Sequence, residues 1–142
     1  MPAQSDPHLG PSARIAKAVA EISRTPSRVA EVFDDLSNWE RIWRATPESW
    51  NCAEIAGHLL DAEIAFGYRV RIALAETGKA MDMFEQDAWV RSQGYSEAPV
   101  EETMATFAAL RRNLVLLATR LSDAELDRHY FHAMRGRQTV AD

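Results

Sequence analysis

The stretch from residue 51 to residue 77 most constrains what this chain can fold into. On a helical wheel at about 100° per residue, its apolar side chains gather on one side, which is typical of an amphipathic helix. Asn51, followed three residues later by Glu54, is a typical start for such a helix, and Gly78 is a typical stop. The apolar stripe consists of Ile55, Leu59, Ala62, Phe66, Val70 and Ala73. A helix of this length with one apolar face predicts partner helices that cover it.

The same spacing predicts three more helices. One covers residues 12–23, a second runs from Thr25-Pro26 to about Ala45, and a third runs from Pro99 to about Leu121. A capping residue followed by proline, as at Thr25-Pro26, predicts a new helix start. The stripe of the last helix is Met104, Phe107, Leu110, Leu114, Leu117 and Leu121.

The remaining segments show no strand pattern, because none alternates apolar and polar residues for long enough. Residues 78–98 are expected to be irregular with one short turn at 87–89, residues 135–138 to form a loop, and Thr139 to cap another helix. The predicted fold is all-α, an antiparallel bundle of helices with short and medium connections. Residues 1–11 are expected to be a flexible tail, and residues 12–142 a single domain.

Composition excludes several classes of protein. The net charge of −5 and the absence of a basic cluster argue against nucleic-acid binding. No apolar run reaches the roughly 20 residues of a membrane span, and the first residues do not resemble a secretory signal, so a cytoplasmic location is expected. The single cysteine, Cys52, excludes a disulfide framework and a cysteine metal cluster.

His58 is the candidate metal ligand in the helix 51–77. It lies at the edge of the apolar stripe, roughly 60° from Ile55 on the wheel, with Glu54 and Asp61 as neighbours on the same side. A histidine there can reach the interior of a bundle, where metal sites are built, or it can be a structural residue. Spacing alone does not decide between a metal ligand and a structural histidine.

Three other ionisable residues need an explanation. Glu63 falls inside the apolar face, where a carboxylate is costly unless it is paired or binds a metal. Its expected partner is an arginine, with Arg14, Arg28, Arg111 and Arg112 as the candidates. His129 and His132 are three residues apart, which suits a shared metal on a helix, but Tyr130-Phe131 and the nearby Gly136 suggest a loop instead.

A longer pattern runs through the same region. The sequence Trp50-Asn51, Glu54, His58-Leu59, Asp61 and Glu63 resembles the Trp-Ser-x-x-Glu-x-x-x-His-Leu-x-Asp-x-Glu pattern of the DinB/YfiT-like family of metalloproteins, with Asn51 in place of the usual serine. The resemblance covers roughly residues 23–142. It includes segments 84–89 with Gly94-Tyr95, 110–114 and 136–142, in the order and spacing of that family.

The resemblance implies a four-helix bundle, often dimeric, that holds a divalent metal such as nickel or zinc with three histidines. His58 matches the first of them, and Glu54, Asp61 and Glu63 would lie around the metal ligands. The family's other two histidines come from a His-x-x-x-His motif on its fourth helix, which would lie beyond Asp142. The chain is therefore expected to be a truncated form, although loss of the site is the alternative.

Two functions follow as hypotheses, and neither has an assigned catalytic residue. The first is a metal-dependent enzyme of the thiol-transferase or small-molecule hydrolase type, acting on a small substrate with a low-molecular-weight thiol as one candidate partner. The second is a non-catalytic dimeric helical module, stress-related or regulatory, with an incomplete metal site. A bundle without its fourth helix would expose an apolar groove, which residues 12–23 or a second chain could fill.

Overall fold

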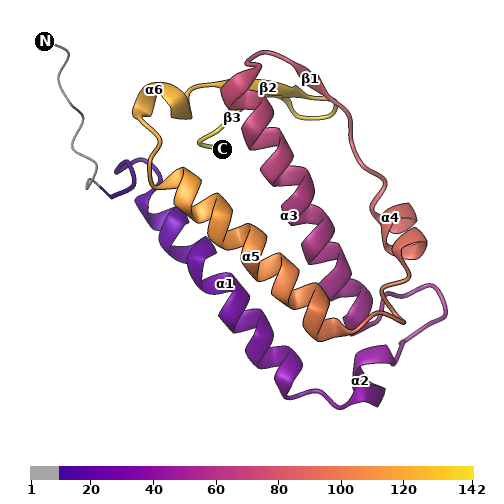
Figure 1. Ribbon diagram of the computed structural model, residues 1–142. Coiled ribbons are helices and arrows are strands. Elements are labelled where there is room, and N and C mark those ends of the chain that lie inside the picture. Colours follow the sequence, from indigo (N-terminus) through magenta and orange to yellow (C-terminus); the bar gives the residue numbers. More distant parts are fainter. Residues whose placement is uncertain (1–9) are drawn as a thin grey trace, which may run out of the picture.

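A computed structural model describes residues 10–142, in which three long helices lie side by side (Figure 1). They are α1 (Ala16–Asp34), α3 (Cys52–Ala75) and α5 (Val100–Ala118), and α5 lies between the other two. The expected tail, residues 1–11, lies almost wholly outside the described residues. Within residues 10–142, no helix is long and apolar enough to cross a membrane.

The bundle is not antiparallel throughout, which corrects one expectation. Helices α3 and α5 run in the same direction, and α1 runs against both (Figure 1). The parallel arrangement is possible because residues 76–99 return along the length of α3. This segment contains the short strand β1 (Ala80–Met81) and the helix α4 (Gln86–Gln93), which is longer than the expected turn at 87–89 and ends at Gly94 with φ +66°.

Helix α1 is continuous through Pro26, so the predicted break at Thr25-Pro26 is wrong. A proline inside a helix leaves the carbonyl four residues earlier without its usual N–H donor. Here that carbonyl belongs to Ile22, and the Arg111 side chain donates a hydrogen bond to it at 3.1 Å. Arg111 comes from α5, so a tertiary contact supplies the donor that the proline removes.

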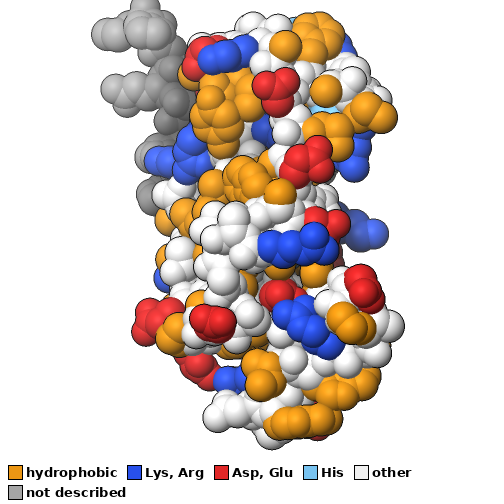
Figure 2. Space-filling model, turned by 90° about the vertical axis from the view of Figure 1, so that its right-hand side faces the viewer, with side chains coloured by type: hydrophobic (Ala, Val, Ile, Leu, Met, Phe, Trp, Pro, Cys, Tyr) orange, Lys and Arg blue, Asp and Glu red, His pale blue; other side chains and the backbone are white. Residues whose placement is uncertain are grey.

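The predicted helix also ends early, at Asp34 instead of Ala45. A separate short helix follows, α2 (Asn38–Ile42), which begins with a capping box formed by Ser37 and Glu40. The large side chains Trp39 and Ile42 of this helix, and Trp43 just after it, are mostly exposed. Figure 2 shows hydrophobic side chains gathered at the lower end of the molecule, the end where α2 lies in Figure 1.

The other two predicted helices are confirmed with small changes of boundary. Asn51 and Glu54 form the capping box at the start of α3, with bonds of 2.9 Å and 3.0 Å. Helix α5 is followed by a short helix α6 (Asp123–Leu126), which Ser122 caps. Of the predicted stripe of α5, Met104, Phe107 and Leu121 are buried, Leu114 and Leu117 are half-buried and Leu110 is exposed.

A small sheet at one end of the bundle was not predicted. Strand β2 (His129–His132) pairs in parallel with β1 and antiparallel with β3 (Gly136–Thr139), so part of the expected loop at 135–138 is a strand. In register, Ala80 lies opposite Phe131, and His132 lies opposite Gly136, whose φ is +70°. Strands of two to four residues are too short to show a period of two in the sequence. The fold is therefore mostly helical rather than strictly all-α.

The apolar stripe of α3 faces mainly a groove between α1 and α3. Ile55 and Phe66 are 44% and 46% exposed, whereas the small residues Ala53 and Ala56 are buried in the core with Phe107 of α5. The groove contains hollows of about 410 Å³ and about 320 Å³, and the second is also lined by residues 140–142. The described residues thus leave one side of the three-helix layer partly uncovered.

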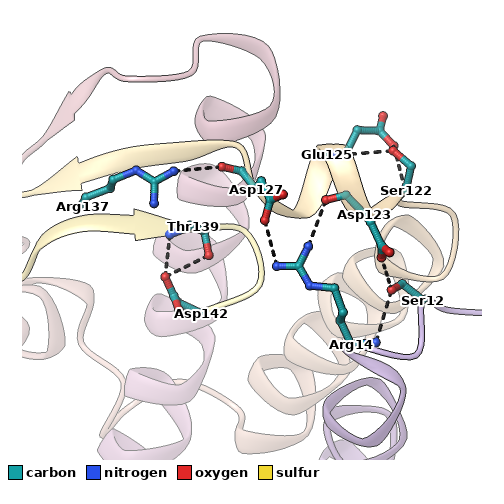
Figure 3. A network of polar contacts seen from close by, with 9 residues as sticks. All are labelled: Ser12, Arg14, Ser122, Asp123, Glu125, Asp127, Arg137, Thr139 and Asp142. Carbon is teal, nitrogen blue, oxygen red and sulfur yellow. Dashed lines mark hydrogen bonds and ion pairs between the residues drawn. The ribbon is translucent and has the colours of Figure 1, made fainter.

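A network of polar contacts joins the start of α1 to α6 (Figure 3). The Ser12 hydroxyl donates to Asp123, and Arg14 donates to the backbone carbonyl of Asp123 at 3.1 Å and to the carboxylate of Asp127 at 2.8 Å. Nearby, the Thr139 backbone N–H donates to Asp142 at 2.7 Å, which is half of a capping box. The predicted cap at Thr139 therefore forms a turn at the last described residues.

Candidate metal centre

His58 lies on α3 with its imidazole ring against Trp50. The ring centroids are 4.9 Å apart and the planes are tilted by 46°. The Nδ1 atom of His58 is buried and has no hydrogen-bond partner among residues 10–142. A buried polar atom without a partner costs free energy, so the local packing keeps this nitrogen available for a proton, a ligand or a metal ion.

Asp61 lies less than one turn further along α3 and is 2% exposed. The Tyr95 hydroxyl donates a hydrogen bond to Asp61 Oδ1 at 2.6 Å, while Asp61 Oδ2 is buried without a partner among the described residues. Burial raises the pKa of Asp61, and the Tyr95 hydrogen bond and the charge of His58 partly lower it again. The pKa of Tyr95 is raised as well, first by burial and then by the Asp61 carboxylate.

Tyr95 can reach Asp61 because residue 57 is a glycine. A Cβ atom at Gly57 would lie 2.0 Å from Cδ2 of the Tyr95 ring, far inside van der Waals contact. The tyrosine therefore lies directly on the backbone of α3, one residue before His58. Tyr95 is a part of this site to which sequence reasoning gave no role, although a glycine inside an apolar helix is a known signal of close approach.

Glu54 is held by Arg44, which comes from the segment before Trp50. The guanidinium of Arg44 donates to both carboxylate oxygens at 2.5 Å and 2.7 Å and to the carbonyl of Ser49 at 2.7 Å. This pairing lowers the pKa of Glu54 and is the largest cause of the shift. Since Glu54 also caps α3, it fixes the segment that carries Trp50 against the helix.

Glu63 pairs with Arg111, one of the four arginines named as candidates. The carboxylate is 4% exposed and accepts three hydrogen bonds from the guanidinium, two at 2.9 Å and one at 2.6 Å. The Arg111 Cζ atom also lies 5.1 Å from the centroid of the Phe107 ring. Glu63 is therefore the centre of an ion pair between α3 and α5, which explains how a carboxylate is tolerated inside the bundle.

The structure brings together His58 and Asp61 but holds Glu54 and Glu63 on separate arginines. Within residues 10–142, no three side chains of histidine, cysteine, aspartate or glutamate lie close enough to hold a metal ion. The assignment of His58 as a ligand and of Glu54, Asp61 and Glu63 as residues around it stays a prediction. The described residues supply one well-placed nitrogen donor, not a complete ligand set.

His129 and His132 do not form a pair. They lie on strand β2 at an odd separation, so their side chains point to opposite faces of the sheet. Nδ1 of His132 accepts hydrogen bonds from the backbone N–H groups of Met134 and Arg135, at 3.1 Å and 3.2 Å. A metal shared between these two histidines, which was one alternative from their spacing, is therefore not compatible with the described geometry.

The raised pKa of Asp61 predicts how the stability of the protein depends on pH. Because its pKa in the folded protein lies above its usual value, the folded state binds the proton more tightly than the unfolded chain does. Stability should therefore fall as pH rises from the unfolded pKa through the folded pKa. Asp61→Asn keeps an acceptor for Tyr95 and removes this titration, so the stability of the variant relative to wild type should increase with pH across that window. Urea unfolding at a series of pH values measures this, and a constant difference would contradict it.

The fold is a layer of long helices, one of which carries a half-buried histidine whose Nδ1 atom has no partner within residues 10–142. Residues 21–142 match the model of the DinB superfamily, and the chain belongs to that superfamily. A protein of Oceanobacillus iheyensis is 24% identical over 121 residues, which cover 85% of this chain and 69% of that protein. A protein of Halalkalibacterium halodurans is 24% identical over 127 residues, covering 87% and 74%. The names of both assign them provisionally to the metal-dependent hydrolases.

A solved structure shares the fold. YfiT from Bacillus subtilis, described as a probable metal-dependent hydrolase with an unusual four-helix bundle topology, superposes with a TM-score of 0.84 at 15% sequence identity. The superposition covers 98% of this chain and 79% of YfiT. The match to the family model confirms the predicted membership of the DinB/YfiT-like family, and the superposition shows a YfiT-like helical bundle.

Proposed function

We propose that this protein is a divalent-metal-dependent hydrolase in which His58 supplies one metal ligand. The observation that carries the proposal is the buried Nδ1 atom of His58, which has no partner among the described residues. Its neighbours suit such a role, because Trp50 fixes the ring and Asp61 places a buried carboxylate oxygen nearby. The hydrolase names of two relatives support the same function.

The described residues fit this function in part. A nitrogen of His58 would bind the ion, and the remaining donors would come from outside residues 10–142, since no second and third donor converge there. When bound, the metal would lower the pKa of a coordinated water or thiol and so supply a nucleophile at neutral pH. In its finer parts, the proposal takes nickel or zinc as the metal and a low-molecular-weight thiol as the co-substrate. It also places the protein in the cytoplasm as a homodimer.

This chain's own residues would position and tune the site. The Tyr95 hydroxyl donates a hydrogen bond to the Asp61 carboxylate, which fixes the orientation of that carboxylate on α3. Arg44 and Glu54 fix the segment that carries Trp50. Trp50 in turn limits the rotation of the His58 ring and shields one side of it from water.

Metal content tests the proposal. Because the other donors would lie outside residues 10–142, we expect the purified chain, titrated with zinc or nickel, to bind about one ion per chain weakly, with water completing the coordination. His58→Ala should lose it, because the variant removes the only assigned donor. His129→Ala is the matched control, since that histidine lies on the sheet and its loss should leave the metal content unchanged.

A non-catalytic helical module is the second candidate. It is favoured by the incomplete donor set within residues 10–142. Equal metal content in wild type and His58→Ala, including none in both, would argue against the metal-dependent hydrolase and for the helical module. Sedimentation of the same samples would show whether the chain forms the proposed homodimer.

A further inference from the structure

A separate pocket lies between α3 and the segment that follows it. Its volume is about 400 Å³, and it is lined by residues 64, 65, 68 and 69 of α3, by residues 79–84 and by Trp89 of α4. None of these residues belongs to the His58 site described above. The walls are largely apolar, with Ile64, Met81 and Phe84 among them.

Arg69 is the unusual residue of this pocket. The residue is 7% exposed, yet no group among residues 10–142 accepts a hydrogen bond from its side chain, and no carboxylate among them lies within ion-pair distance. The other buried or half-buried arginines of the bundle are all paired. Arg41 contacts Glu101, Arg44 contacts Glu54 and Arg111 contacts Glu63.

The Arg69 guanidinium lies near two aromatic rings. Its Cζ atom is 5.4 Å from the centroid of Phe66 and 5.9 Å from the centroid of Phe84. Such contacts stabilise a cation by about 0.5–2 kcal/mol each, but they satisfy none of its five N–H donors. No nitrogen of Arg69 is among the enclosed, unpartnered polar atoms of the described residues, so these donors are open to water or to a ligand in the pocket.

The neighbouring histidine, His132, does not accept a hydrogen bond from Arg69 through its Nδ1 atom. Nδ1 of His132 already accepts two backbone hydrogen bonds, and the pKa of His132 is lowered by burial and by the positive charges of Arg69 and Arg135. Lys79 and Asp82 also line the pocket, but Lys79 is paired with Glu76 at 2.8 Å, and the exposed Asp82 makes no ion pair with Arg69. Arg69 thus contributes a positive charge that no described residue neutralises.

We propose that this pocket binds a small organic carboxylate, with the carboxylate on Arg69 and the apolar part of the ligand against Phe84 and Trp89. The planar guanidinium matches a carboxylate in a two-pronged geometry. A single unneutralised cation suits a monoanion better than a phosphate dianion, since Lys79 is already paired and Asp82 adds a negative charge. The apolar walls favour a ligand with an aromatic or aliphatic body.

Binding of benzoate tests the proposal, with benzamide as its neutral counterpart and inorganic phosphate as a second anion. The titrations use the 142-residue chain with a chelator present, so that the result does not depend on a metal at His58. The readout is the indole N–H signal of Trp89 in NMR spectra, assigned with Trp89→Phe. We expect benzoate to bind at least about tenfold more tightly than benzamide, and Arg69→Gln to weaken benzoate about tenfold or more.

Arg71→Gln is the matched control, because it removes the same charge two residues away. The Arg71 side chain contacts the carbonyl of Gly67 and Asn113 instead of the pocket. It should leave benzoate binding unchanged. If circular dichroism shows that Arg69→Gln does not fold, Arg69→Lys replaces it, keeps the charge and should still weaken benzoate several-fold because the two-pronged contact is lost.

Four results would overturn the proposal. They are equal binding of benzoate and benzamide, unchanged benzoate binding in the Arg69 variants, no binding of benzoate at millimolar concentration, and tighter binding of phosphate than of benzoate. The last result would show an anion site for phosphate instead of a carboxylate site. None of them bears on metal binding by His58, so this proposal and the proposed hydrolase function can fail separately.

Discussion

Replacing Arg111 with methionine is expected to lower the free energy of unfolding by about 3–5 kcal/mol, the range found when one partner of a buried ion pair is removed. The variant would leave the carboxylate of Glu63 buried without its cation. It would also leave the carbonyl of Ile22 without the donor that replaces the N–H missing at Pro26. Chemical denaturation of the wild type and the variant measures the loss.

Arg112→Met is the matched control, since it changes the adjacent arginine, which is exposed. Its effect should stay within about 0.5 kcal/mol. Adding Pro26→Ala to Arg111→Met should recover part of the loss, because an alanine N–H can donate to Ile22 within the helix. A loss below about 1 kcal/mol in Arg111→Met would show that the ion pair does not stabilise the bundle in the way described.

Gly57→Ala is expected to destabilise the protein by roughly 2–5 kcal/mol. The added methyl group would lie 2.0 Å from the Tyr95 ring, so the ring must leave α3. Overpacking of this kind costs about 1–3 kcal/mol, and loss of the hydrogen bond from Tyr95 to the Asp61 carboxylate adds about 1.5–3 kcal/mol. The greater helix preference of alanine offsets about 0.5–1 kcal/mol of this cost. Urea unfolding measures the change, and the tyrosine signals in NMR spectra report whether the ring has moved.

Gly67→Ala is the comparison on the same helix. Its added methyl group would meet only the end of the flexible Arg71 side chain, at 3.1 Å, and an alanine favours the helix by about 0.5–1 kcal/mol. This variant should therefore be close to neutral or slightly stabilising. If Gly57→Ala were equally well tolerated, the close contact between Tyr95 and α3 would not be needed for stability.

Helix α3 could be predicted from the sequence because its signals are local. A capping pair, a long apolar stripe and a glycine stop all lie within one segment. The capping pair, Asn51 and Glu54, forms the capping box at the start of α3 as expected. The stripe was predicted to be buried, but much of it lines the groove between α1 and α3. A wheel shows which residues share a face, and it does not show how fully that face is covered.

The continuity of α1 and the direction of α5 could not be predicted in this way. The break at Pro26 is prevented by Arg111, which is 85 positions away in the sequence and arrives only in the folded protein. The parallel course of α3 and α5 depends on the path of residues 76–99, whose strand β1 is only two residues long. Both features result from contacts between distant segments, on which local patterns carry no information.

Part of the candidate site could be predicted from the sequence. His58 and Asp61 were singled out from their position on the helix, and an arginine was expected at Glu63. The contact of Tyr95 with Gly57 and the unpaired state of Arg69 were not expected. The Tyr95 contact had a sequence signal, namely the glycine inside an apolar helix. The unpaired state of Arg69 had none, because an arginine without a partner cannot be recognised from its neighbours in the sequence.

The small sheet has a consequence for the order in which the molecule folds. The pairing of Ala80 with Phe131 closes a loop of about fifty residues that includes α4 and the whole of α5. Closing a long loop costs entropy, which a strand pair as short as β1–β2 cannot offset alone. The helices are therefore expected to associate before β1 meets β2, so this parallel pairing forms late in folding and opens early when the bundle loosens, whereas the β2–β3 hairpin is local.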